Sequence, residues 1–367
     1  MAGRKKPAAL YAYVGCFTSP KRGGTGDGIG VYRVNAETGA WRAVQKVEPL
    51  VNPSWLLANR AGTVMYALHA DGDHASAFDI DRDSGRLSPM GTAKTDGING
   101  VSAKLDAAER FMVLANYGSG HVNVLPVLKD GALGDAIQSI ALPGEPRLRH
   151  RVGHQESAHP HDIVFDPTGR FVIVPDKGLD RIFVFRFNAR TGRLTPAGKG
   201  GFIDARDGAG PRHVAFHPRF PVAWVLNELD STLTTCRWDG KTGVLSPIDL
   251  VLTVPGDFTG DNQTSEIEFV ASTNTLYISN RGHNSLTLFR VNRTTGLPKL
   301  IGWQKTGGKG PRFFGFDPSG RFLYAAHLRS HTIKRFAVDA RSGALTAAGQ
   351  AVATPSPCAI EFVEGAP

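Results

Sequence analysis

Residues 156–194 read ESAHPHDIVFDPTGRFVIVPDKGLDRIFVFRFNARTGRL. Apolar and aromatic residues alternate with others in the runs DIVF and RIFVFRF, and Gly, Pro and Asp separate one run from the next. This pattern is typical of short antiparallel strands joined by tight turns. The stretch therefore predicts one small antiparallel sheet.

The features of this sheet recur along the chain. A turn that closes a strand on glycine appears at Gly39, Gly85, Gly131, Gly192, Gly243, Gly296 and Gly343, with spacings of 46, 46, 61, 51, 53 and 47 residues. A hairpin turn with its following strand, as in DPTGRFVIVPDKG and DPSGRFLYAAHL, appears six times. Such a period indicates a repeat architecture in which each unit is one sheet.

The hairpin appears six times and the glycine turn seven times, and the two chain ends supply the strands of the missing hairpin. LYAYVGC (10–16) has the pattern of a second strand, and SPCAIEF (356–362) has the pattern of a first strand. If both lie in one sheet, they close a ring and remove its exposed edges. We therefore predict an all-β fold, a seven-bladed β-propeller of four-stranded antiparallel blades. It forms a single domain over residues 1–367, with 1–9 as a flexible tail.

Cysteine usage and the N-terminus bear on location. Cys16, Cys236 and Cys358 show no metal-binding spacing, and their odd number is typical of a reducing compartment. The N-terminal MAGRKKPAAL lacks the apolar core and the cleavage site of a signal peptide. We expect a cytoplasmic protein with free thiols and no membrane partner.

The formal net charge is +9, and the basic residues are spread through turns without interleaved aromatics. This distribution argues against nucleic-acid binding. It fits either a solvated surface or a positive funnel that steers a small anion. The longest connection, 143–158, carries Arg147, Arg149 and Arg151 and could act as a lid. The glycine-rich loop SPKRGGTGDGIG lacks the helix of a phosphate cradle and is interpreted as a long hairpin loop.

In a propeller blade, the start of the first strand and the end of the second lie on the same face of the disc. Residues at these places in blades four, five and six should therefore converge on one rim. They are His159, His161, Arg212, His213, Asn227, Glu228, Glu266, Asn280, Arg281 and His283. Such a set is suited to binding an acidic ligand and moving a proton.

Structural roles are open for most of these residues. His159 and His161 could cap strands, and Arg212 and Arg281 could tie neighbouring blades through Glu228 or Glu266. Asn227 and Asn280 could simply be turn residues. A calcium site at Glu228 with the two asparagines is conceivable, but the surrounding Arg and His argue against a cation.

The chain resembles the lactonase seven-bladed propellers, a family that includes the bacterial cycloisomerase-type 6-phosphogluconolactonase and the fungal carboxy-cis,cis-muconate cyclase. The resemblance extends from YVGCFTS to SPCAIEF. Its most specific pieces are HPHDIVFDPTGRFVIVPDKGLDRIFVF, GAGPRHVAFHP, VLNELDSTLT, DFTGDN with SEI, and YISNRGHNSL. Their order and spacing carry the resemblance.

The resemblance implies a catalytic set of His161, Arg212, Glu228 and Arg281, which match HPHD, GPRH, NEL and NRG. Two motifs differ from the family pattern. NGVSAK replaces the Pro-x-His expected at the start of blade three, and Glu266-Ile267-Glu268 replaces Glu-Ile-His in blade six. These differences bear on the substrate, while the expected fold is unaffected.

The activity implied is hydrolysis of a sugar lactone, most simply 6-phosphogluconolactone of the pentose phosphate pathway. Arg212 and Arg281 would hold the phosphate or polarise the carbonyl, and Glu228 or His161 would be the general base. This chemistry needs no metal or organic cofactor. The expected partner is a small anionic lactone, bound by a monomer or weak homo-oligomer.

The supporting substrate-binding residues would be His159, His213, Asn227, Glu266, Asn280 and His283. Two alternatives stay open. One is a cycloisomerase that closes a carboxymuconate to its lactone, because the same arginines would bind its carboxylates. The other is a non-enzymatic propeller that docks a protein, although an ionisable rim is less suited to that role than an apolar one.

Overall fold

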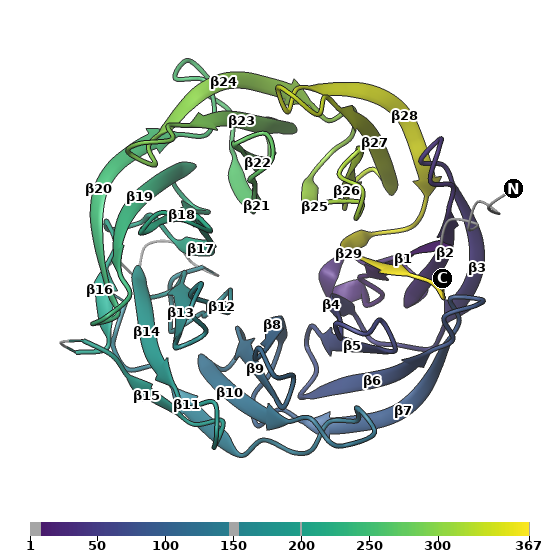
Figure 1. Cartoon of the computed structure of the whole chain (residues 1–367), viewed down its shortest axis with the longest axis horizontal. Helices are drawn as coiled ribbons and strands as arrows, with labels where there is room; N and C mark the ends of the chain where they lie inside the picture. Colours follow the sequence, from purple (N-terminus) through teal and green to yellow (C-terminus); the bar gives the residue numbers. More distant parts are fainter. Residues whose placement is uncertain (1–8, 147–153, 199, 367) are drawn as a thin grey trace, which may run out of the picture.

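The computed structural model describes residues 9–146, 154–198 and 200–366. Seven antiparallel sheets surround a central axis (Figure 1), and we number them as blades one to seven in chain order. The predicted seven-bladed propeller is thus confirmed. The expected tail, except for Ala9, and the three arginines of the basic connection lie outside the described residues.

In the first four blades the strands follow one another from the axis outward. Blade one contains β29 (Pro357–Glu364), β1 (Leu10–Cys16), β2 (Ile29–Val34) and β3 (Trp41–Val47), with the short 3-10 helix η1 (Pro20–Arg22) between β1 and β2. Blade two contains β4 (Pro53–Ala58), β5 (Val64–His69), β6 (His74–Ile80) and β7 (Leu87–Lys94). Blade three contains β8 (Gly100–Leu105), β9 (Phe111–Asn116), β10 (His121–Pro126) and β11 (Gln138–Ala141). Blade four contains β12 (Val164–Phe165), β13 (Phe171–Asp176), β14 (Arg181–Phe187), β15 (Leu194–Pro196) and β16 (Phe202–Asp204).

The remaining three blades follow the same order. Blade five contains β17 (Pro211–Phe216), β18 (Val222–Asn227), β19 (Thr232–Asp239) and β20 (Val244–Leu252). Blade six contains β21 (Gln263–Val270), β22 (Thr275–Arg281), β23 (Ser285–Val291) and β24 (Pro298–Lys305). Blade seven contains β25 (Pro311–Phe316), β26 (Phe322–His327), β27 (Thr332–Val338) and β28 (Leu345–Ala353).

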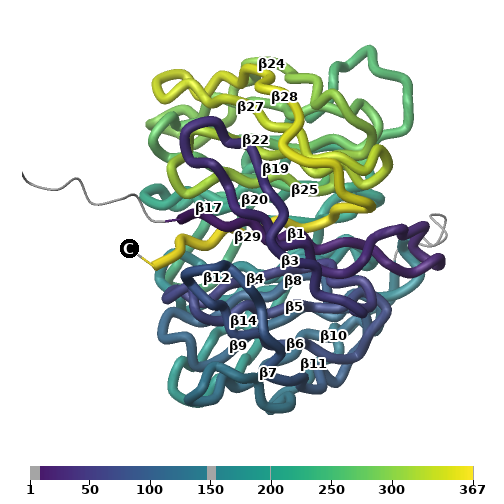
Figure 2. Tube along the Cα trace, turned by 90° about the vertical axis from the view of Figure 1, so that its right-hand side faces the viewer, coloured from purple at the N-terminus to yellow at the C-terminus, as the bar shows by residue number. Residues whose placement is uncertain are grey.

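The two ends of the chain share blade one, as the sequence predicted. β1 pairs antiparallel with β29, from Leu10 opposite Glu364 to Gly15 opposite Ala359. Figure 2 shows purple β1 and yellow β29 side by side. Because β29 and β1 come from opposite ends of the chain, this pairing completes blade one and closes the ring.

Blade four differs from the other six in its outermost strand. β15 pairs with the second half of β14, and β16 pairs with the first half. Between them, Gly198, Gly200 and Gly201 all have positive φ, a conformation that glycine adopts without steric cost. β15 and β16 are therefore two halves of one outermost strand that a glycine-rich segment interrupts.

The hydrophobic core lies between adjacent blades. β13 is buried at every position from Phe171 to Asp176, whereas the outermost β20 alternates mainly between exposed and partly buried positions. One cluster packs Phe171 and Ile173 of blade four against Val225 and Trp238 of blade five. A second strand that is covered on both faces needs apolar residues on both, which explains why these runs are continuously apolar.

The turn glycines found in the sequence also accept hydrogen bonds that join one blade to the next. Gly343 has a φ of 71°, and its carbonyl accepts a hydrogen bond of 2.6 Å from the Tyr277 hydroxyl of blade six. The equivalent bonds are Tyr13 to Gly85, Tyr66 to Gly131, Trp224 to Gly296 and Tyr324 to Gly39. An aromatic residue of each of these second strands thus packs on the turn of the following blade.

Replacement of a turn glycine that contacts the neighbouring blade should destabilise the protein more than replacement of a turn glycine with open space around it. A Cβ atom at Gly343 would lie 2.6 Å from both the Tyr277 hydroxyl and Thr275 Oγ1. Gly320 of the same blade has a φ of 67° but open space around its Cβ position. We expect Gly320→Ala to cost about 1–2 kcal/mol in unfolding free energy, and Gly343→Ala a further ~1–3 kcal/mol. Denaturant unfolding measures both, and equal losses would contradict the packing role.

Candidate active site

A bulge near the start of the innermost strand turns one side chain toward the axis. In blade five the register shifts between Pro211 and His213, which leaves Arg212 as the extra residue. Bulges commonly re-aim a side chain in this way. The corresponding residues are Ser54 in blade two, Val101 in blade three and Arg312 in blade seven. In blade four, His161 lies between the bridge at Pro160 and β12.

The ends of the second strands supply the other half of the site. Tyr117, Lys177 and Glu228 each directly follow the second strand of their blade, and Arg281 is the last residue of β22. Neighbouring side chains on a strand point in opposite directions. The residues just before these four therefore point into the blades instead.

Both sets of side chains meet in a cavity of about 260 Å³ on the axis. The charged lining residues in the described part of the chain are five cations and one carboxylate, namely Arg22, Lys177, Arg212, Arg281, Arg312 and Glu228. Tyr117, His154, His161, Asn99 and Gln263 add polar groups. The cavity is therefore strongly electropositive around a single carboxylate among its lining residues.

Glu228 contacts three of the cations in the cavity. Its side chain is 3% exposed, and Lys177 Nζ lies 3.2 Å from its Oε1. Arg212 and Arg281 both approach the other oxygen, Oε2, at 2.7 and 3.2 Å. Three cations on one buried carboxylate form a charge-assisted network that fixes the positions of all four side chains.

The network keeps Glu228 ionised. Burial alone would raise the pKa of Glu228, but Lys177, Arg281 and Arg212 together hold that pKa well below its usual range. Burial also lowers the pKa of Arg281 to about 9, in spite of Glu228. At neutral pH the site thus contains a carboxylate able to accept a proton, surrounded by charged donors.

His161 is a neutral member of the site. Arg212 donates through Nη1 to His161 Nε2, which assigns the ring proton to Nδ1. Burial, together with Arg212 and His213, lowers the pKa of His161 well below its usual range. Among the described residues, Nδ1 has no hydrogen-bond partner. A buried donor without a partner is suited to a substrate oxygen.

The buried Asp180 positions the site from outside the cavity. It accepts hydrogen bonds of 2.7 Å from the backbone N–H groups of both Gly208 and Gly210, just before Arg212. Gly210 in turn accepts a bond of 2.7 Å from the backbone N–H of Glu228. The loop that precedes the bulge is therefore tied to the strand end that carries the carboxylate.

Asn227 and Asn280, predicted as substrate-binding residues, point into their blades. Asn227 donates to Thr232 and Thr234 Oγ1 at 2.9 and 3.0 Å. Asn280 donates to Thr287 Oγ1 at 2.8 Å. Strand alternation explains this placement, because each asparagine directly precedes a cavity residue. The calcium alternative needs both amides beside Glu228, whose oxygens face cations instead.

Other predicted residues surround the cavity without lining it. His159 stacks on the Tyr117 ring at 4.4 Å and contacts the Tyr117 carbonyl oxygen through Nδ1 at 2.9 Å. His213 lies behind His161, with 5.4 Å between the ring centroids. His283 contacts Phe258 at the wall of a neighbouring groove of about 770 Å³.

Glu266 belongs to a second hollow, of about 420 Å³, farther along the innermost strands. Its Oε1 accepts a hydrogen bond of 2.9 Å from His213 Nδ1. In the same hollow, burial raises the pKa of Glu268 to about 8 and that of Glu361 to about 7. The His213–Glu266 pair therefore separates the electropositive cavity from an acidic hollow.

Several cavity residues were missed by the sequence reasoning. Lys177 and Tyr117 occupy the same place after a second strand as Glu228, so the motifs PDKG and ANYG contained the signal. Arg312 occupies the same bulge position as Arg212 in the repeated PR motif. Arg22 and Phe17 come from the loop after β1, which has no periodic pattern in the sequence.

The comparisons with known proteins agree with this fold. The model of the family described as "Lactonase, 7-bladed beta-propeller" matches residues 11–362. The chain belongs to this family. A 6-phosphogluconolactonase of Bacillus subtilis is 32% identical over 354 residues, which cover 96% of this chain and 97% of the relative. The protein accordingly belongs to the lactone-hydrolysing enzymes.

Solved structures show the same architecture. The periplasmic gluconolactonase of Pseudomonas aeruginosa superimposes with a TM-score of 0.89 at 28% identity, covering 97% of this lactonase-family chain and 100% of that structure. A structure from Bacteroides fragilis, titled a putative 6-phosphogluconolactonase, gives a TM-score of 0.87 at 28% identity, covering 99% of this chain and 100% of that one.

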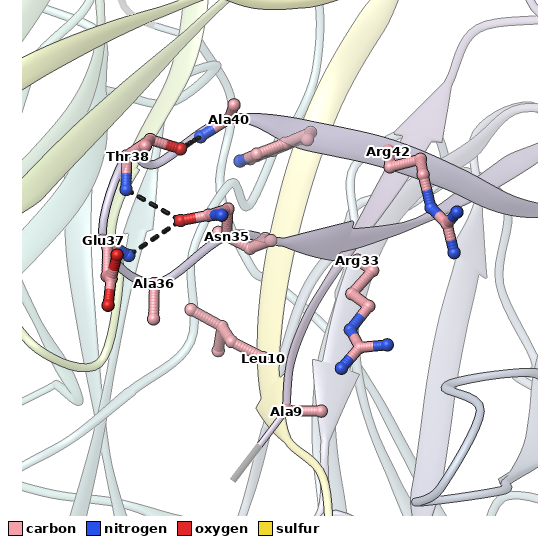
Figure 3. Close-up of a pocket in the computed structure, with 11 residues that line it drawn as sticks. Ala9, Leu10, Arg33, Asn35, Ala36, Glu37, Thr38, Ala40 and Arg42 are labelled. Carbon is pink, nitrogen blue, oxygen red and sulfur yellow. Dashed lines mark hydrogen bonds between the residues drawn. The ribbon is translucent and has the colours of Figure 1, made fainter. Parts of the chain in front are cut away.

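A hollow of about 720 Å³ in blade one of this lactonase-family propeller is lined by the start of β1, the end of β2 and the turn that leads into β3 (Figure 3). Asn35 Oδ1 accepts hydrogen bonds from the backbone N–H groups of Glu37 and Thr38, at 2.9 and 2.8 Å. Arg33 and Arg42 lie on adjacent strands and are exposed. Asn35 thus holds a turn, and Arg33 and Arg42 face solvent.

Neither a membrane helix nor a metal cluster was found in the described parts of the chain. None of the helices there has the length and apolar character needed to cross a bilayer. Within the same residues, no group of three or more His, Cys, Asp and Glu could hold a metal ion. The three cysteines are buried free thiols, as predicted.

The direction of the Asn280 side chain predicts a structural role. We expect Asn280→Ala to lower the free energy of unfolding by about 1–3 kcal/mol, because it removes the buried hydrogen bonds that the Asn280 amide makes with Thr253 and Thr287. Catalytic activity of the folded protein should change little. Urea unfolding and a lactone-opening assay would measure the two effects. A large rise in KM at unchanged stability would instead place Asn280 in the substrate site.

Proposed function

We propose that the protein hydrolyses 6-phosphogluconolactone to 6-phosphogluconate in the cavity around Glu228. The observation that carries the proposal is an ionised carboxylate, buried in a cavity and contacted by Lys177, Arg212 and Arg281. The family match and the relatives named as lactonases support the reaction class. The substrate would place the protein in the pentose phosphate pathway.

In the first step, Glu228 takes a proton from a water molecule as that water attacks the lactone carbonyl carbon. The carbonyl oxygen becomes an oxyanion. Arg212 and Arg281 converge on Glu228 Oε2. Arg212 also donates to the Ser265 carbonyl oxygen and Arg281 to that of Thr264, and the N–H groups left over would stabilise the oxyanion on that side. The Nδ1–H of His161 offers a further neutral donor inside the cavity.

In the second step, the tetrahedral intermediate collapses and the bond from the carbonyl carbon to the ring oxygen breaks. Glu228 returns its proton to that oxygen, which becomes a hydroxyl group of the open chain. The new carboxylic acid loses its own proton to water. Lys177 holds Oε1 throughout, so the carboxylate keeps its orientation during both transfers. In this proposal Glu228, rather than His161, is the base.

The cytoplasmic location and the monomeric or weakly oligomeric state remain predictions. The Pseudomonas aeruginosa relative is named as periplasmic. The cycloisomerase and the protein-docking module have no comparable support from these relatives.

Replacement of the base by an amide of nearly the same size should lower the catalytic rate strongly. We expect Glu228→Gln to reduce the enzymatic rate by about 10²- to 10⁴-fold, the usual contribution of a general base. Lactone opening followed directly by NMR, with freshly generated 6-phosphogluconolactone, separates this rate from spontaneous hydrolysis.

Asn280→Ala is the matched control for this experiment, because Asn280 neighbours the site but points into a blade. Full activity of a folded Glu228→Gln variant would show that the carboxylate is not the base. No acceleration by the wild-type protein would reject this lactone as the substrate.

The dependence of kcat on pH should report the depressed pKa of Glu228. A base is active only when deprotonated, so a lowered pKa keeps kcat constant from about pH 7 down to about 5. The pH profile is measured for kcat instead of kcat/KM, because the phosphate of the free substrate titrates at about pH 6 and this titration would also change kcat/KM.

Lys177→Met provides the comparison for this pH profile. Lys177 makes the largest favourable electrostatic contribution to the ionised form of Glu228. Its removal raises the pKa of Glu228, so the fall in kcat on acidification should begin at a higher pH. A fall near about pH 6.5 that is the same in both proteins would point to a histidine as the base.

A further inference from the structure

Arg312 brings a guanidinium into the cavity without an anionic partner. It is the bulged residue of β25 and lines the cavity. In the described part of the chain, its side chain makes no hydrogen bond or ion pair, and its Cζ lies 5.2 Å from the centre of the Phe17 ring. Burial and the nearby Arg212 lower the pKa of Arg312 to about 10, so it is still charged at neutral pH.

Arg22 approaches the same aromatic ring. Its Cζ lies 5.8 Å from the centre of Phe17. Asp71 accepts hydrogen bonds from Nε and Nη2 of Arg22 at 2.9 and 2.8 Å and thereby fixes the guanidinium at the cavity wall. Two arginines therefore share Phe17 as a support, and only one of them is neutralised by a carboxylate.

The two arginines lie across the axis from blade four. Arg312 belongs to blade seven, and Arg22 to the loop after β1 in blade one. In Figure 1, β25 and β29 face β12 and β13 across the centre of the ring. Lys177 and His161 come from blade four, on the opposite wall of the cavity. A ligand held at both walls must carry a polar group at each end.

The charges of the cavity do not balance. After Arg22 is paired with Asp71, the described lining residues retain four cations, of which three contact Glu228 and one, Arg312, has no carboxylate partner among them. They exceed the single carboxylate by three charges. A phosphomonoester carries a charge of about −2 near neutral pH. It would neutralise two of the three excess charges.

We propose that Arg312, supported by Phe17 and Arg22, forms a subsite for the phosphomonoester at the end of the substrate remote from the lactone carbonyl. The inference rests on the proposed lactone-opening function and separates its arginines into two groups. Arg212 and Arg281 act at the carbonyl, whereas Arg312 recognises phosphate and selects phosphorylated over neutral lactones. A guanidinium is suited to this role because its donors match phosphate oxygens in pairs.

The test compares two substrates and two products. We expect Arg312→Gln to lower kcat/KM for 6-phosphogluconolactone by about 10- to 100-fold, the range of one lost charge-assisted contact. The kcat/KM for unphosphorylated gluconolactone should stay within about threefold of the wild-type value. Titration calorimetry should show weaker binding of 6-phosphogluconate and unchanged binding of gluconate. Arg312→Lys should keep part of the preference, because it retains the charge without the paired donors.

Arg341→Gln is the matched control, since it removes one positive charge from an exposed turn of the same blade. It should leave kcat/KM unchanged for both substrates. Thermal unfolding establishes that the variants are folded. If Arg312→Gln does not fold, Arg22→Gln tests the same subsite from a loop outside the sheets.

The outcomes separate this inference from the proposed function. Equal losses on both substrates, or a wild-type protein with no preference for phosphate, would overturn the subsite and leave the lactonase proposal intact. If the wild-type protein opens neither lactone but binds 6-phosphogluconate more tightly than gluconate, and Arg312→Gln removes that difference, the subsite stands and the proposed reaction fails.

Discussion

Antiparallel pairing between β1 and β29 is the constraint on which the rest of the molecule depends. Each blade is apolar on both faces, so it needs a neighbour on either side. An open row of blades would leave two such faces in water, and only a closed ring covers them all. Closure also fixes the number of strand ends around the axis, and hence the size and composition of the cavity.

The cavity shows how the ring can gather charge in one place. A bulge at the start of the innermost strand and the end of the second strand each direct one side chain inward. The electrostatic cost of burying several cations is high unless they are paired. Glu228 offsets part of this cost, and loop contacts such as Asp180 to Gly210 hold the charged residues in place. The remaining positive charge is what makes the cavity suited to a multiply charged anion.

Much of the candidate site could be predicted from the sequence, because the repeat places equivalent residues at equivalent positions. Arg212, Glu228 and Arg281 were found by that argument and do meet in the cavity. Asn227 and Asn280 were included by the same argument, yet their amides bond to threonines inside the blades. The difference is one residue along a strand, which reverses the direction of the side chain.

The sequence by itself determined the number of blades, the sharing of blade one by the two termini and the face on which polar residues gather. Turn glycines and apolar runs specify these features locally, so their spacing can be read along the chain. Only the tertiary structure decided which polar residues line the cavity. Bulges shift the register by one residue, and loops such as that of Arg22 reach the axis from outside the repeat. Neither effect has a period, so the direction of each side chain depends on contacts between blades.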